Sequence, residues 1–271
     1  MAAITAAMVN ELRSKTGLAM MECKKALVES DGDVQNAIDN LRKKGVKTSI
    51  TERQATEGRA HTGASADGKT AAAVVVNCNT DFTAKSEPVA KILELAVSRL
   101  LANPDADVSS DPAIVAAMTA TSQQTGENVL IGKTAVVSSP AGQVGTYVYS
   151  ITGKIVVILA LSGKTADEDL IKQIGGHIAF SKPFGLTRAE VPADLVAKER
   201  EIAVEQAKAT GKPQQIAEKI AEGKLNSFFA ERVLLDQEFF NAQVFKGSVG
   251  NMLKEKGIVL EKYVRLEVGQ A

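Results

Sequence analysis

Few side chains in this chain of 271 residues are of the types that carry out chemistry. A nucleophilic or acid–base enzyme needs a nucleophile, a base and a group that orients the base. His61 falls in a polar loop, where we expect it to be exposed, and His177 falls in a predicted helix as an ordinary helix residue. Neither lies beside a cysteine or a metal-ligand pattern. We therefore expect no catalytic residues, no metal site and no cofactor.

Cys23 and Cys78 lie in separate predicted elements and form no Cys-x-x-Cys pair, so neither a disulfide framework nor a zinc site is indicated. We expect both to be buried thiols. A thiol enzyme that uses Cys78 would need a lowered thiol pKa, and the sequence offers no cause for one.

Two Gly-Lys-Thr runs suggest a phosphate-binding loop, Gly132-Lys133-Thr134 and Gly163-Lys164-Thr165. That loop also needs a glycine separated from the Gly-Lys by four residues, and those positions hold Glu127 and Ile158. We therefore expect no direct nucleotide binding.

The composition is that of a globular protein with a real core, since 45% of the residues are hydrophobic. The 32 basic and 32 acidic residues balance, so nucleic acid or an anionic membrane is not indicated as the main partner. The start has no signal-peptide pattern, and no window approaches the roughly 20 apolar residues of a membrane span. We expect a cytoplasmic protein without direct nucleic-acid or membrane binding, and homodimer formation is left open.

Residues Val74 to Lys85 are the central stretch of the chain. Val74, Val75 and Val76 predict a buried strand, the polar residues up to Asp81 supply loop and cap chemistry, and a helix is expected from Glu87. Phe82 is unusual, because an aromatic just after a strand cannot easily enter the same core. It either folds back onto the local core or stays exposed for a partner.

The first 45 residues predict three short helices. We expect Met20 to point into their core and Met21 to point outward. One face of the second helix carries Met20, Cys23 and Leu27, and another carries Met21, Lys24, Lys25 and Val28.

Two similar stretches follow a polar linker at residues 46–57. Gly68-Lys69 and Gly153-Lys154 each predict a hairpin turn before an apolar strand, and the same spacing separates Thr80 from Thr165 in the loops that follow. We predict an α+β fold with two related subdomains, 58–145 and 146–271. Residues of about 192–235 predict an antiparallel helical hairpin, and 262–268 a final strand.

The run V-N-C-x-T-D-F-x-A-K around Phe82, and Leu12 to Leu27 near the N-terminus, resemble bacterial elongation factor Ts, the nucleotide exchange factor of elongation factor Tu. The resemblance extends over nearly the whole chain. It implies an N-terminal bundle of the ubiquitin-associated type, a duplicated α/β-sandwich core, and a coiled-coil arm formed by the helical hairpin. It also implies a non-enzymatic exchange factor that binds elongation factor Tu with GDP, displaces Mg²⁺ and promotes GDP release.

The resemblance also implies which residues contact the partner. Those of the Mg²⁺-displacing loop are Thr80, Asp81, Phe82 and Thr83, and those of the N-terminal bundle are Arg13, Met20 and Met21. Gly126 belongs to the run Thr125–Asn128 that matches the family's Ile-Gly-Glu-Asn, and Tyr149 stands where the family often has histidine.

Two other readings come from different classes of protein. An interaction scaffold that uses the N-terminal bundle would explain the bundle but leaves Phe82 unexplained. The thiol enzyme is the weaker of the two. Release of labelled GDP from a GTP-binding partner distinguishes all three, because only the exchange factor accelerates it.

Overall fold

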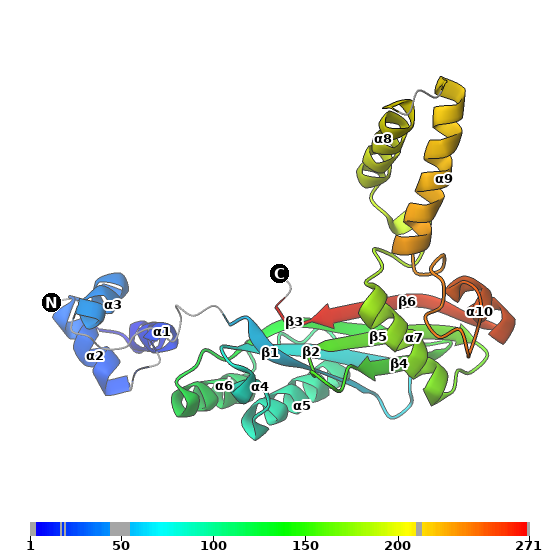
Figure 1. Ribbon diagram of the computed structural model, residues 1–271. Coiled ribbons are helices and arrows are strands. Elements are labelled where there is room, and N and C mark those ends of the chain that lie inside the picture. Colours follow the sequence, from blue (N-terminus) through cyan, green and yellow to red (C-terminus); the bar gives the residue numbers. More distant parts are fainter. Residues whose placement is uncertain (1–3, 17, 19, 44–54, 210–212, 270–271) are drawn as a thin grey trace.

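The computed structural model describes the whole chain except residues 1–3, 17, 19, 44–54, 210–212 and 270–271. It has the predicted α+β fold: three N-terminal helices, then two antiparallel sheets with helices packed on them, and a pair of long helices that projects away from the sheets (Figure 1). Most of the predicted linker, 46–57, lies outside the described residues.

The N-terminal bundle consists of α1 (Ala6–Thr16), α2 (Met20–Glu29) and α3 (Val34–Lys43). The Met8 amide donates to the Thr5 hydroxyl over 3.3 Å and the Asn36 amide to the Asp33 carboxylate over 2.9 Å, so α1 and α3 each have a side-chain cap at the N-terminus. The buried core of the bundle comprises Val9, Leu12, Cys23, Ala26, Leu27 and Ala37.

Met20 does not belong to this core, and its predicted inward orientation is wrong. Met20 is 52% exposed and Met21 is 74% exposed. The apolar stripe of α2 ends at Cys23, because Leu18 packs on the core and Thr16 contacts the Cys23 thiol at 3.7 Å. Met20 and Met21 form the start of α2, and both remain on the surface.

The first sheet contains β1 (Glu57–Ala64), β2 (Thr70–Cys78) and β3 (Leu130–Ser138) in that order. Its hairpin between β1 and β2 turns at Gly68, whose φ of +68° favours glycine. Helix α5 (Glu87–Ala102) packs on the sheet and α6 (Pro112–Thr125) packs beside it, while the single turn α4 (Asp81–Ala84) follows β2 directly.

The second sheet contains β4 (Gln143–Val148), β5 (Ile155–Gly163) and β6 (Ile258–Glu267), again in that order. Helices α7 (Glu168–Ser181) and α10 (Val249–Lys256) pack with it. The predicted turn at Gly153 is present, with a φ of +64°. Strand β6 begins four residues before the predicted start at Lys262, and α10 was not predicted.

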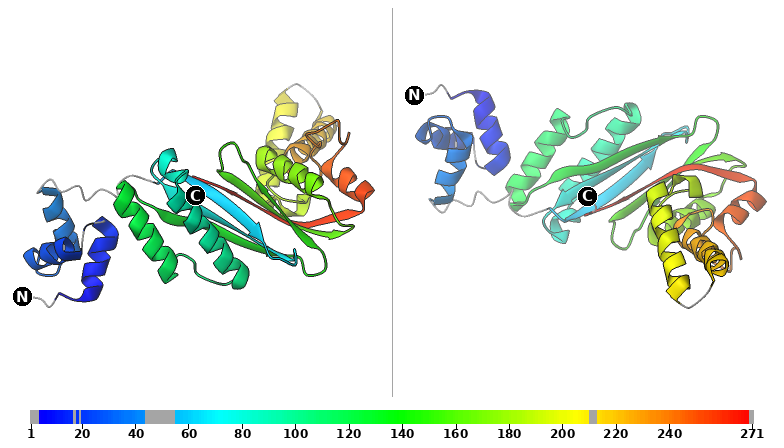
Figure 2. Two further views of the ribbon diagram at one scale, coloured as in Figure 1. Left: turned by 90° about the horizontal axis from the view of Figure 1, so that it is seen from below. Right: turned by 90° about the horizontal axis from the view of Figure 1, so that it is seen from above.

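The two sheets pack face to face, which places the central strand of each between a helix layer and the other sheet (Figure 2). Alternate residues of a strand point to opposite faces. In β2, Val74 and Val76 pack with α5, whereas Ala73 and Val75 pack with the second sheet. Strand β5 divides in the same way. Burial on both faces explains why these strands are continuous apolar runs instead of alternating ones.

The boundary between the two halves lies earlier than the predicted one at 145/146. That position falls inside β4, whose residues Gln143 to Val148 all pair with β5. The last strand of the first sheet ends at Ser138, so the chain passes from one sheet to the other between β3 and β4. The turn at 139–142 reads Ser-Pro-Ala-Gly and closes with a hydrogen bond from the Gly142 amide to the Ser139 carbonyl oxygen at 3.1 Å.

The projecting pair of helices is α8 (Ala193–Ala209) and α9 (Gln214–Arg232), which run side by side (Figure 1). Small residues Ala203, Ala207, Ala217 and Ala221 are buried between them. A 3₁₀ turn, Arg188–Glu190, lies at the base, where the Arg188 guanidinium is 2.7 Å from the Asp236 carboxylate. The helical hairpin predicted at about 192–235 thus corresponds to two described helices.

Candidate functional site

Phe82 lies on the surface, which decides between the two orientations left open by the sequence. The residue is 84% exposed, on the single helical turn α4 that follows strand β2. The next two residues, Thr83 and Ala84, are buried and anchor the turn to the core. The aromatic ring is therefore held by a fixed backbone while its own side chain faces solvent.

Thr80, one of the polar residues expected to supply cap chemistry, caps this turn. The Thr80 side chain accepts a hydrogen bond from the Thr83 amide at 3.3 Å. Asp81 instead pairs with Lys85 at 2.8 Å, with both side chains at least half exposed. The hydrogen bond from Lys85 lowers the pKa of the Asp81 carboxyl below its ordinary value. Asp81 thus contributes an exposed, partly neutralised charge beside Phe82.

Glu127 joins the loop to the far end of α6. Its carboxylate accepts from the amide of Asn79 at 3.1 Å, the amide of Thr80 at 3.0 Å and the Thr80 hydroxyl at 2.6 Å. Burial raises the pKa of the Glu127 carboxyl, but hydrogen bonds from Thr80, Thr83 and the Asn79 backbone outweigh this and leave its pKa lowered. In the sequence, Glu127 is marked only by its place in the run Thr125–Asn128.

Gly126 allows the chain to turn so that Glu127 reaches the loop. It ends α6 in the left-handed conformation, with a φ of +70°. Asn128, two residues further along the chain, donates its backbone amide to the side-chain oxygen of Asn79 at 2.7 Å. The structure therefore brings the predicted residue Gly126 and the loop 80–83 together, through the residues that follow the glycine.

The turn between β4 and β5 lies beside the Phe82 loop. Together they line a shallow pocket of about 180 Å³, with Asp81, Ala84 and Lys85 on one side and residues 150–154 on the other. Ile151 in this turn is 79% exposed and was not singled out in the sequence. The second half of the molecule thus adds an apolar side chain next to the loop of the first.

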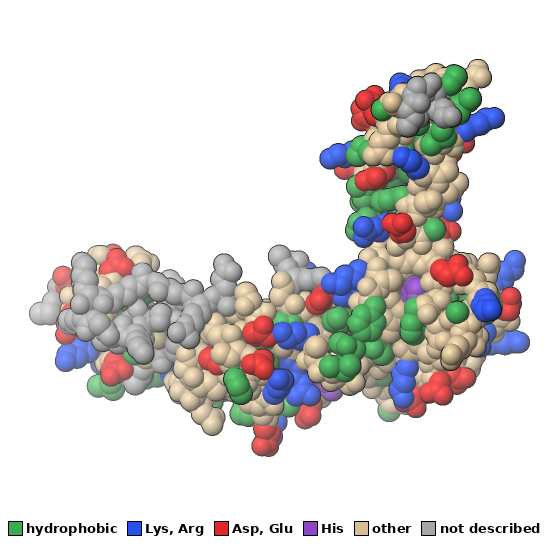
Figure 3. All heavy atoms as spheres, viewed as in Figure 1, with side chains coloured by type: hydrophobic (Ala, Val, Ile, Leu, Met, Phe, Trp, Pro, Cys, Tyr) green, Lys and Arg blue, Asp and Glu red, His purple; other side chains and the backbone are tan. Residues whose placement is uncertain are grey.

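Tyr149 does not line this pocket. It is partly buried against the core of the second half, where its ring meets that of Phe180 edge to face at 4.9 Å. Phe180 is itself 59% exposed, and Figure 3 shows hydrophobic side chains gathered over this part of α7. Tyr149 therefore contributes to the apolar surface that includes Phe180.

The three predicted residues of the bundle differ in their surroundings. Met21 lines a hollow on α2 together with Glu22, Lys24, Lys25, Val28 and Glu29. Met20 is exposed at the start of the same helix. Arg13 lies on α1, and its Nε atom is buried without a hydrogen-bond partner among the described residues. The bundle therefore presents a methionine surface with basic side chains at its edge.

The thiols and histidines are in structural positions. Both cysteines are buried, as predicted, and burial raises the pKa of the Cys78 thiol to about 11, which opposes formation of a reactive thiolate. His61 lies half-buried in β1 and not in an exposed loop. His177 is in helix α7, as predicted, but is buried. Within the described residues, no three His, Cys, Asp or Glu side chains are placed to hold a metal ion.

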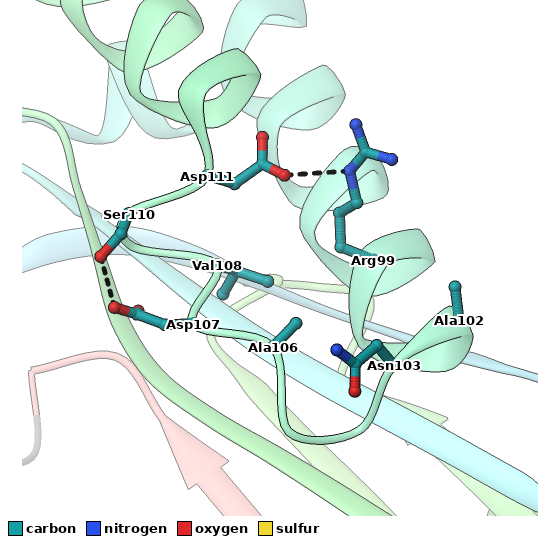
Figure 4. A pocket seen from close by; sticks show the side chains of 8 residues that line it. All are labelled: Arg99, Ala102, Asn103, Ala106, Asp107, Val108, Ser110 and Asp111. Carbon is teal, nitrogen blue, oxygen red and sulfur yellow. Dashed lines mark hydrogen bonds and ion pairs between the residues drawn. The ribbon is translucent and has the colours of Figure 1, made fainter.

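A cavity of about 390 Å³ lies between α5 and α6 (Figure 4). Its charged groups already have partners: the Arg99 guanidinium is 3.1 Å from Asp111, and Asp107 accepts hydrogen bonds from the Ser109 and Ser110 hydroxyls. Asp111 also caps α6. These contacts stabilise the connection between the two helices.

None of the described helices is both long and apolar enough to cross a membrane.

The fold and the site describe an α+β protein whose most exposed large apolar side chain, that of Phe82, is held on a well-anchored backbone, as in proteins that act by contacting another macromolecule. A family model described as Elongation factor TS matches residues 79–270. Elongation factor Ts of Photorhabdus laumondii subsp. laumondii is 40% identical over 273 aligned residues, which cover 100% of this chain and 94% of that protein. Elongation factor Ts of Yersinia pestis (strain Pestoides F) is 40% identical over 273 residues, covering 100% and 93% respectively. The chain belongs to the elongation factor Ts family of translation elongation factors.

Proposed function

We propose that this chain is a guanine nucleotide exchange factor that binds elongation factor Tu with GDP, displaces its Mg²⁺ and promotes GDP release. The observation that carries the proposal is the position of Phe82, which is 84% exposed on a loop whose backbone is held by Glu127 and Thr80. An aromatic anchor on a backbone that is already ordered before binding is effective, because less conformational entropy is lost on association.

The proposed mechanism is mechanical. Mg²⁺ requires near-ideal octahedral geometry, so a small displacement of its ligands weakens its binding and that of GDP. Phe82 acts as the wedge that displaces them, and Thr80, Asp81 and Thr83 form the loop that carries it. This chain contributes binding energy and needs no bond-making group of its own.

The bundle supplies a second proposed contact. Arg13, Met20 and Met21 bind the GTPase domain of elongation factor Tu through the methionine surface described above, since Met21 and Met20 are both exposed. Methionine side chains adapt readily to a partner's surface. Gly126 and Tyr149 are proposed as additional contacts from the two halves of the core.

The test is the rate at which elongation factor Tu releases fluorescent GDP. Phe82→Ala is expected to slow release by about 30-fold, which corresponds to the roughly 2 kcal/mol of an aromatic hot spot. The melting temperature is expected to be unchanged, because the ring is outside the core. Phe184→Ala is the matched control, since this ring is 51% exposed but lies at the base of the arm. Unchanged release by a folded Phe82→Ala variant would contradict the proposal.

A non-enzymatic interaction scaffold that uses the bundle is the second candidate. It is favoured only by the hollow on α2 lined by Met21 and Val28. It gives no reason for an exposed Phe82. The same assay separates the two candidates, because a scaffold binds without accelerating GDP release.

A further inference from the structure

Asn79 and Thr80 connect strand β2, which ends at Cys78, to the turn α4, which begins at Asp81. Their amides therefore lie outside both elements, and backbone amides at such positions need another acceptor. A single carboxylate oxygen of Glu127 accepts from both amides, at 3.1 and 3.0 Å, and its second oxygen accepts from the Thr80 hydroxyl at 2.6 Å.

Two further contacts hold the same segment. The Cys78 thiol donates to the Thr80 carbonyl oxygen at 3.1 Å, and the Asn128 amide donates to the Asn79 side chain at 2.7 Å. Thr80 is thus held through its amide, its hydroxyl and its carbonyl group. The charged acceptor is Glu127, and hydrogen bonds to a charged group are the stronger ones.

Phe82 itself lacks such support, since its side chain is almost fully exposed. The direction in which its ring points is consequently set by the backbone of the loop, and Glu127 reaches that backbone from 47 residues away in the sequence. We propose that Glu127 is a positioning residue for nucleotide exchange: it acts through the Thr80 loop to hold Phe82 in the orientation that enters the partner. This inference rests on the proposed function of Phe82.

The kinetic consequence differs from that of removing Phe82. Without Glu127 the loop samples several orientations, and only the competent fraction binds, so the apparent affinity falls by that fraction. Glu127→Ala is expected to raise the half-saturating concentration in the GDP-release assay by about 5- to 10-fold. The rate at saturation is expected to stay within about twofold, because Phe82 is still present to act once bound.

Conservative variants distinguish geometry from charge. Glu127→Gln retains the length of the side chain, and its one oxygen can still accept from the two amides. Glu127→Asp retains the charge but is one carbon shorter and does not reach them. We expect Gln to restore most of the apparent affinity and Asp to behave like Ala. The opposite order would show an effect of charge and would overturn the positioning role.

A double-mutant cycle with Phe82→Ala tests whether Glu127 acts through the ring. In the Phe82→Ala background, Glu127→Ala is expected to have no further effect on half-saturation. The matched control is Glu168→Ala, which removes an exposed carboxylate on α7 that pairs with Lys172. A full Glu127→Ala effect in the absence of Phe82, or an effect equal to that of the control, would contradict the inference.

Amide hydrogen exchange of the free protein gives a readout that does not depend on the partner. Glu127→Ala is expected to accelerate exchange at Asn79 and Thr80 by at least 10-fold and to leave the amides of the β2 interior unchanged. Unchanged exchange at both positions would overturn the inference. If Phe82→Ala alone leaves GDP release unchanged, the proposed function fails; if Phe82→Ala slows release and Glu127→Ala has no effect, only the positioning role fails.

Discussion

The Nε2 atom of His177 lies 3.0 Å from the side-chain oxygen of Gln237, and both residues are buried. The amide of Phe240 donates to the other ring nitrogen, Nδ1, at 3.3 Å. Because Nδ1 accepts, Nε2 carries the proton and donates to Gln237, and the imidazole is neutral. Gln237 in turn donates to the carbonyl oxygen of Glu231 at 2.8 Å, so this histidine joins α7 to the end of the arm helix α9.

This arrangement predicts a loss of stability on acidification. Burial lowers the pKa of His177 below its ordinary 6.5, so the unfolded chain takes up a proton at a higher pH than the folded one. The contribution of the neutral imidazole is complete above pH 6.5 and decreases as the pH falls below it, by up to about 1.4 kcal/mol per pH unit. His177→Gln is expected to flatten the fall in melting temperature between pH 6.5 and 5.

His61 provides the control for that experiment. Burial also lowers its pKa, but it lies in β1 and is only half-buried. His61→Gln is expected to remove a smaller part of the same pH dependence. A His177→Gln variant whose melting temperature falls as steeply as that of the original chain would contradict the assignment of a neutral, buried imidazole.

The two methionines of α2 are expected to behave alike in stability measurements. Met20→Ala and Met21→Ala should each change the melting temperature by less than about 2 °C, because both side chains are exposed. Leu27→Ala is the positive control, since Leu27 is fully buried and truncation of such a side chain costs about 2–5 kcal/mol.

The same pair tests the proposed bundle contact. Both methionine variants are expected to weaken binding to elongation factor Tu, with the larger effect from the more exposed Met21. Melting of Met20→Ala as early as Leu27→Ala would show that Met20 belongs to the core after all. Normal binding by both variants would remove the bundle from the interface.

Gly126→Ala is expected to lower stability by about 1 kcal/mol, because a φ of +70° is unfavourable for a residue with a Cβ atom. The added methyl group itself meets no atom within 4 Å, so no steric clash adds to this cost. The melting temperature should fall by about 2–4 °C. The melting temperature of Gly126→Asn should fall less than that of Gly126→Ala, since asparagine tolerates the left-handed conformation. Equal melting of the alanine variant and the original chain would argue against a strained backbone.

Reciprocal coupling is expected between GDP and this chain if it acts as an exchange factor. A protein that weakens GDP binding to elongation factor Tu must itself bind more weakly when GDP is present, by the same factor. Titration calorimetry with nucleotide-free and with GDP-saturated elongation factor Tu measures both affinities. Equal affinities in the two titrations would be incompatible with the proposed mechanism.

Local features of the chain were predictable from sequence because neighbouring residues determine them. The valines of β2, the glycines at the hairpin turns, the caps of α1 and α3, and the helical hairpin all follow from periodicity and turn chemistry. The two buried thiols and the special position of Phe82 were also recognisable. The run around Phe82 and the stretch from Leu12 to Leu27 also resemble the family without any knowledge of tertiary contacts.

Features that depend on packing between distant segments required the tertiary structure. Met20 has the spacing of a core residue, but it is the first residue of α2 and is half exposed, whereas Leu18 just before it packs on the core. The passage between the sheets, in the turn before β4, depends on strand pairing, because only the pairing of β4 with β5 assigns Gln143 to Val148 to the second sheet. The contact of Glu127 with the Thr80 loop also required the tertiary structure. Its hydrogen bond joins residues 47 positions apart, and a contact at that distance produces no periodic pattern in the sequence.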